Sequence, residues 1–255
     1  VYPNSNLNLK LTQEFIERNR KYGDAKNVAL IKGFIFDTTE SPDSTKHVYA
    51  PWIAHQSHVP VSIIGYAFFA LVLLGLCTSI VVFKHWLSRA VIAVFLVYIT
   101  GITTDFPPFS WGSMLLQNFL PFYRDAFRTP FTKFAFGVAF SYGLLIAVAI
   151  AGLAVLLRQY INKKLFQIIV AVLSLSLIIY GLPVLRGHFI AARLVTSYPQ
   201  AYKDLFTFMQ QQETTGKVAD LPQDMYTGWY TYRWGYSGSG FLWYGIEQPI
   251  VSRTF

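Results

Sequence analysis

The chain has 255 residues, of which 53% are hydrophobic and only 13% are charged. Its mean hydropathy is +0.38. Because soluble domains contain about 25% charged residues, this composition argues against an ordinary soluble fold and favours a protein that lies in lipid. The formal net charge is +8, but the cations are spread along the chain and form no basic block. Nucleic acid is therefore not expected as a partner.

The first 58 residues are polar and mixed, and we expect them to face water. Residues 9–21 place Leu11, Phe15 and Ile16 near helical spacing, which indicates a short amphipathic helix. Residues 28–37 (VALIKGFIFD) fit either a strand or a second short helix. Residues 38–45 are rich in Thr, Ser, Asp and Pro, which is typical of turns.

Four apolar segments follow, over about residues 59–83, 87–104, 134–157 and 165–185. The first and the last two contain no charge and are long enough, at about 1.5 Å per residue, to cross a hydrocarbon core about 30 Å thick. The second is shorter and crosses only if Arg89 reaches the interface. We therefore predict a predominantly α-helical polytopic membrane protein with about four transmembrane helices over residues 59–185.

The short loops between these segments are cationic. Lys84 and Arg89 lie between the first two, and Arg158, Lys163 and Lys164 lie between the last two. The positive-inside rule places both loops in the cytoplasm. Residues 1–58, the 105–133 loop and residues 186–255 would then be extracytoplasmic, and the protein would be a multi-pass protein of the plasma membrane.

Residues 186–255 indicate a small α+β segment. Residues 198–212 place Tyr202, Leu205 and Phe206 on one helical face after Pro199. Residues 217–255 are rich in aromatic residues and glycine and favour strands. Trp234 and Trp243 are candidates for stacking on a glycan, because tryptophan presents a flat apolar face with a polar edge. The alternative is that these aromatic residues form the core of a small β-layer.

The 105–133 loop contains the main candidate site. Its end reads LPFYRDAFRTPFTKF from residue 120 to residue 134, with Arg124, Arg128 and Lys133 among apolar residues. Cations at a membrane surface suit a phosphate whose lipid tail stays in the bilayer. The alternative is that these side chains only anchor a helix end at the lipid headgroups. No metal-binding motif is present, since His55 and His58 lack a further nearby ligand. No cofactor is therefore expected, although a divalent metal ion stays open.

Three stretches resemble bacterial membrane glycosyltransferases of the GT-C superfamily. They are FRTPFTKF (127–134) after LPFYRDA, GSGFLWYGIEQPIVSR (238–253) and APWIAHQSHVPVSIIGY (50–66). The relatives that they resemble are arabinofuranosyltransferase-like and YfhO-type membrane proteins. The motifs are degenerate, although the resemblance touches most of the chain.

The resemblance implies an enzyme that transfers a sugar from a polyprenyl-phosphate donor to a cell-surface glycan acceptor. Arg124, Arg128 and Lys133 would then hold the donor phosphate. The family's catalytic carboxylate lies in an early outer loop, and no residue here matches it. Since the chain starts at Val1 and ends after a strand-like stretch, we expect an internal fragment of a longer protein. The alternative function is a non-enzymatic membrane protein for assembly, transport or partner binding.

Overall fold

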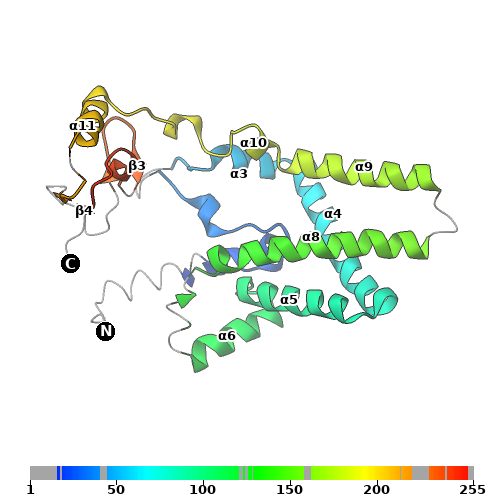
Figure 1. The fold of residues 1–255 in the computed structure, drawn as a ribbon. Helices are drawn as coiled ribbons and strands as arrows, with labels where there is room; N and C mark the ends of the chain where they lie inside the picture. Colours follow the sequence, from blue (N-terminus) through cyan, green and yellow to red (C-terminus); the bar gives the residue numbers. More distant parts are fainter. Residues whose placement is uncertain are drawn as a thin grey trace.

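The computed structural model describes residues 16–17, 19–40, 45–120, 123, 126–127, 129–157, 162–212, 214–219, 230–238 and 240–251. The described part is mostly helical (Figure 1). Its longer helices are α3 (Ala50–Ser57), α4 (Val59–Thr78), α5 (Trp86–Ile102), α6 (Phe109–Phe119), α8 (Pro130–Leu156), α9 (Lys163–Tyr180) and α11 (Gln200–Gln210). The short helical pieces are α2 (Ala25–Ala29), η1 (Phe34–Asp37), η2 (Ser79–Phe83), α10 (Leu182–Leu185), η3 (Ala192–Leu194) and η4 (Leu242–Tyr244).

Three helices among the described residues are long and apolar enough to cross a membrane. They are α4 with its π-helical extension η2, then α8 and α9, and they coincide with the predicted segments 59–83, 134–157 and 165–185. These helices indicate a membrane protein. The predicted segment 87–104 forms α5, which is apolar but has only 17 residues. The total of four crossings therefore stays a prediction.

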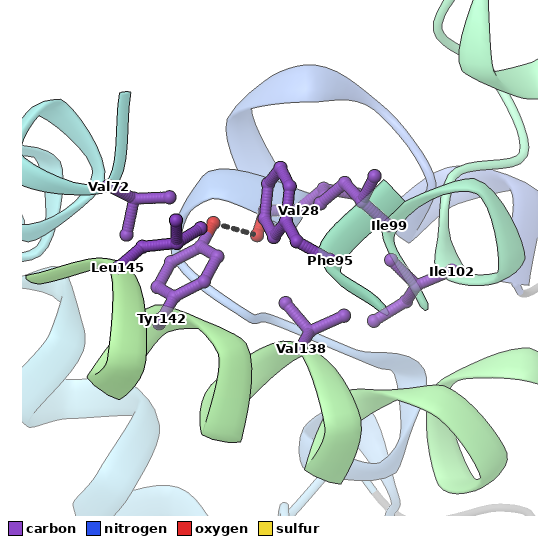
Figure 2. Packing of buried hydrophobic residues seen from close by; sticks show 8 residues of the cluster. All are labelled: Val28, Val72, Phe95, Ile99, Ile102, Val138, Tyr142 and Leu145. Atoms are coloured by element: carbon purple, nitrogen blue, oxygen red, sulfur yellow. Dashed lines mark hydrogen bonds between the residues drawn. The ribbon is translucent and has the colours of Figure 1, made fainter. Parts of the chain in front are cut away.

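The core lies where α4, α5 and α8 pack against one another. Figure 2 shows it around Val72 of α4, Phe95 and Ile99 of α5, and Val138 and Leu145 of α8. Val72, Val138 and Leu145 are fully buried. Such close packing is the main attraction between helices in lipid, where the hydrophobic effect between apolar surfaces is lost.

Glycines allow the close approach of these helices. A Cβ on Gly75 of α4 would collide with the backbone of Leu145 on α8. One turn further along α4, Thr78 faces Gly152 of α8. A Cβ added to Gly152 would lie 2.7 Å from the Cβ of Thr78. The α4–α8 crossing thus depends on positions without a side chain, as is common between transmembrane helices.

The segment before the membrane helices folds back onto them. Residues 28–37, for which strand and helix were both predicted, form the end of α2 and the helix η1. Val28, Ala29 and Leu30 are buried against α4 and α8. The Tyr142 hydroxyl lies within 3.5 Å of the Val28 carbonyl oxygen and 3.4 Å of the Ala29 carbonyl oxygen (Figure 2). The Val28 carbonyl also accepts from the Ile31 N–H at 3.0 Å, so the Tyr142 hydroxyl adds a contact to a helix end that the backbone already caps.

The ends of the helices fall into two groups. In Figure 1 the link from α4 to α5 lies at the same end of the bundle as the last turn of α8 and the first turn of α9. Helices α3, α6 and α10 and the α11 region lie at the opposite end. The helix ends that flank the two cationic loops therefore lie at the same end of the bundle. Which end faces the cytoplasm stays a prediction.

The last part of the chain forms a small α+β unit beside this opposite end. Strand β1 (Val218–Ala219) pairs in parallel with β4 (Ile250–Val251), and β2 (Tyr230–Thr231) pairs antiparallel with β3 (Ser237–Gly238). The predicted helix within 198–212 is α11. An ion pair between Arg193 and Glu40 joins the chain after α10 to the first segment.

Candidate functional site

A polar pocket lies at the end of the bundle opposite the cationic connections, between the α5–α6 link and the start of α8. Its volume is about 370 Å³. The polar residues that line it are Asn19, Arg20, Thr104, Asp105, Ser110 and Ser113. Ile16, Pro107, Trp111, Met114, Phe127 and Pro130 complete the wall. The pocket therefore offers a cation, a carboxylate and hydroxyl groups beside apolar surface.

Backbone hydrogen bonds hold Asp105 at this pocket. The N–H groups of Thr104 and Asp105 both donate to the Gly23 carbonyl oxygen, at 3.2 and 3.1 Å. A Cβ on Gly23 would overlap the Thr104 side chain, so the approach of these two segments requires glycine. The Arg20 Nε lies 3.5 Å from the Asp105 Oδ1, and both side chains are largely exposed. Such a pair adds little to stability, and both groups remain accessible to a ligand.

The predicted phosphate-binding residues are only partly described. Arg124 and Arg128 lie outside the described residues. Their neighbours Phe127 and Pro130 line the polar pocket, so the chain on both sides of Arg128 reaches it. Lys133 is exposed near the start of α8. Whether Arg124, Arg128 and Lys133 bind a phosphate stays a prediction. No motif in the sequence marks Arg20 and Asp105, which lie far apart along the chain.

A larger apolar cavity of about 640 Å³ lies between α4, α8 and α9. On α8 it is lined by Ala135, Ala139, Gly143 and Ile146, and on α9 by Leu173, Leu177 and Tyr180. Leu30, Phe36 and Trp52 cover its end. Phe131 lines this cavity, whereas its neighbour Pro130 lines the polar pocket. The first turn of α8 thus separates a polar space from an apolar one.

Aromatic side chains surround Trp52 at the end of this cavity. The Trp52 ring lies 5.4 Å from that of Phe189, 6.0 Å from that of Phe36 and 6.2 Å from that of Tyr180, between ring centroids. His55 Nε2 is 2.9 Å from the carbonyl oxygen of Ile179 in α9. These contacts fix α3 across the ends of α4 and α9. They give His55 a structural partner.

Charged side chains lie close together around Asp37 on the first segment. Asp37 accepts hydrogen bonds from the Tyr22 hydroxyl and from Lys21 Nζ, the latter at 3.1 Å. Burial and this carboxylate raise the pKa of Tyr22 above its ordinary value. Burial acts to raise the pKa of Asp37, but the Tyr22 and Lys21 hydrogen bonds and the nearby cations bring it below its ordinary value. Burial, with help from Lys26, lowers the pKa of Lys32.

The two candidate glycan-stacking residues have different surroundings. Trp234 packs among Tyr198, Tyr202 and Phe241, with its ring centroid 5.3 Å from that of Phe241. Trp243 is 54% exposed. Trp234 is therefore part of an aromatic core, while Trp243 presents a free face. A role in glycan binding stays a prediction for both.

The described residues contain no group of three or more His, Cys, Asp or Glu side chains that could hold a metal ion. The polar pocket, whose wall includes Phe127 and Pro130, is the candidate site. Comparison of the chain with protein-family models, curated proteins and solved structures gave no match.

Proposed function

We propose that the protein is a membrane glycosyltransferase that takes a sugar from a polyprenyl phosphate and builds a cell-surface glycan. The observation that supports this most directly is the polar pocket at the end of apolar helices, whose wall includes Phe127 and Pro130, which flank Arg128 in the sequence. A lipid-phosphate sugar has a polar head and a hydrocarbon tail, so its enzyme needs such a pocket at membrane level. The proposal puts this end of the bundle outside the plasma membrane.

The chemistry needs positive charge near the phosphate. A general base, to which no residue of this chain is assigned, takes the proton of the acceptor hydroxyl as its oxygen attacks the anomeric carbon. The bond from that carbon to the phosphate oxygen breaks, and the phosphate leaves on the lipid with its negative charge. Arg124, Arg128 and Lys133 would stabilise that charge, since arginine binds phosphate oxygens through two parallel hydrogen bonds. Arg20 adds a cation on the other wall, and Asp105 offers acceptors to the sugar hydroxyls.

Arg128→Lys tests the phosphate role. The change keeps the charge but removes the paired hydrogen bonds. Since a hydrogen bond to a charged group contributes about 1.5–3 kcal/mol, turnover of a polyprenyl-phosphate sugar should fall about ten- to a hundredfold. Arg186→Lys, at an exposed arginine after α10, is the matched control and should keep wild-type turnover. Equal turnover of the Arg128→Lys and wild-type proteins would leave the loop as a headgroup anchor.

Sidedness tests the placement of the pocket. In a Cys77→Ser background, a cysteine at Lys203 on α11 should react in intact cells with a thiol reagent that does not cross membranes. Cysteines at Lys84 and Lys163 should react only after lysis, because the short cationic loops are expected inside. Labelling of Lys84→Cys in intact cells would invert the topology. Absence of turnover in the intact protein would instead favour the non-enzymatic alternative.

A further inference from the structure

A second apolar cavity lies between α8 and α9, nearer the other end of the bundle. This smaller cavity of about 160 Å³ is lined by Leu71, Leu153, Leu157 and Phe166 and shares Leu173 with the larger one. Together they follow α8 from Ala135 to Leu157. The larger cavity alone covers α8 from Ala135 to Ile146, which at about 1.5 Å per residue is roughly half of a bilayer core about 30 Å thick. That is the depth of one leaflet, so a single acyl chain fits this length.

One polar atom at the end of the cavity lacks a partner. Trp52 lines the cavity and is only 9% exposed. Its indole Nε1 is buried, and none of the described residues accepts its hydrogen bond. Gln56 and Tyr180 nearby are paired, because Gln56 Nε2 donates to the Tyr180 hydroxyl at 3.2 Å and that hydroxyl donates to the Leu30 carbonyl at 3.3 Å. A buried donor without an acceptor is unfavourable, so Trp52 is suited to a ligand that supplies one.

That ligand must be neutral where it meets Trp52. The lining residues of the larger cavity, all of them described, include no Lys, Arg, Asp or Glu. A phosphate placed here would be a buried charge without a counter-ion, which is strongly unfavourable. An ester carbonyl is a neutral acceptor. Trp52 belongs to α3, which ends just before α4 begins. Tryptophan prefers the interfacial level of the bilayer, which is where lipid esters lie.

We propose that this cavity binds one acyl chain of an ester-linked glycerophospholipid, with the ester carbonyl accepting a hydrogen bond from Trp52 Nε1. The lipid phosphate stays outside the cavity, at the headgroup level. This site is separate from the polar pocket and does not depend on the glycosyltransferase proposal. A polyprenyl phosphate has no ester carbonyl, so its chain is not the ligand of this cavity.

Gly143→Leu tests the cavity. Gly143 lines it, and a Cβ added there meets no atom within 4 Å, so a leucine can fill the space without displacing the helices. The control is Ala147→Leu, which adds a similar side chain at an exposed position of the same helix that lines neither cavity. Native mass spectrometry of the delipidated full chain, titrated with dipalmitoyl phosphatidylglycerol, should show at least tenfold weaker binding for Gly143→Leu and unchanged binding for Ala147→Leu.

Trp52→Phe tests the hydrogen bond. It removes the N–H but keeps an aromatic ring against Phe36 and Phe189. Binding of the ester lipid should weaken about two- to tenfold, as expected for one neutral hydrogen bond. The diether analogue lacks the carbonyl and should bind wild type and Trp52→Phe equally.

Because Gly143→Leu favours the helix, that variant is expected to fold, and its thermal midpoint verifies this.

Two results would overturn the proposal. The first is that Gly143→Leu binds the ester lipid as tightly as the wild type does. The second is that polyprenyl phosphate displaces the ester lipid from wild type and itself binds Gly143→Leu weakly, which would assign the cavity to the donor. Neither result bears on the Arg128→Lys turnover, so failure here and failure of the proposed function are distinguishable.

Discussion

Helices α8 and α9 are similar in apolar character but differ in how they pack. Both meet the length and composition of a membrane crossing. Helix α8 buries Gly137, Val138, Tyr142, Leu145 and Gly152 against its neighbours, whereas α9 has no buried residue. Helix α9 contains no glycine, while glycines of α4, α5 and α8 lie at the contacts among those three helices.

The difference separates two properties that an apolar sequence does not distinguish. Hydrophobicity decides whether a helix enters lipid, but small residues decide whether it can approach another helix closely. Without glycine, α9 stays apart from α8 along part of its length, and the apolar cavity occupies that space. Stability should therefore depend on α8 and hardly on α9, while α9 contributes the wall of a binding site.

Truncation of leucine should show the largest contrast. Leu145 of α8 is 0% exposed, whereas Leu175 of α9 is 57% exposed. Leu145→Ala leaves a space in a packed core and should lower the free energy of unfolding by about 2–5 kcal/mol. Leu175→Ala should change it by less than about 0.5 kcal/mol. Thermal midpoints of the purified proteins in one detergent provide the measurement, and similar losses for both would show that α9 packs as tightly as α8.

A methyl group at the α4–α8 crossing should have the next largest effect. In Gly75→Ala the new Cβ meets the backbone of Leu145, which cannot rotate away as a side chain would. Overpacking typically destabilises by about 1–3 kcal/mol, against a gain of about 1 kcal/mol in helix propensity. We expect a lower thermal midpoint than that of the wild type. A midpoint at or above wild type would mean that the two helices separate readily.

The sequence was sufficient to locate the long helices because their evidence is local. Residues 59–83 contain no charge over a length that fits a bilayer, and they form α4 with η2. Helix α11 followed from Pro199 and one apolar face in the same way.

The resemblance to glycosyltransferases is a different kind of evidence. Nothing in the fold or in the comparisons tests it, so it remains a proposal.

The site was harder to predict because it depends on distant contacts. Arg20 and Asp105 are 85 residues apart, and neither belongs to a motif that would mark it. Residues 28–37 also have distant neighbours, since the Tyr142 hydroxyl, which contacts the Val28 carbonyl, lies 114 positions after Val28. No local pattern reports such a partner, which explains why strand and helix could not be distinguished. The cavity beside α9 could not be predicted either. It lies where α8 and α9 do not pack closely, and the sequence does not show how closely two helices approach.

The smallest expected effect has the opposite sign and is the most specific test of the comparison. Gly143 lies on α8, as Leu145 does, but it faces the cavity, and a Cβ there has no atom within 4 Å. Gly143→Ala should therefore stabilise the protein by about 0.5–1 kcal/mol, because alanine loses less backbone freedom in a helix and meets no obstacle. For a chain of this size that corresponds to a rise of about 1–4 °C in the thermal midpoint. Gly75→Ala is the control, since it makes the same chemical change where α4 and α8 touch and should lower the midpoint. If both substitutions lowered it equally, α9 would have to close against Gly143 in solution, and the contrast between the two helices would be lost.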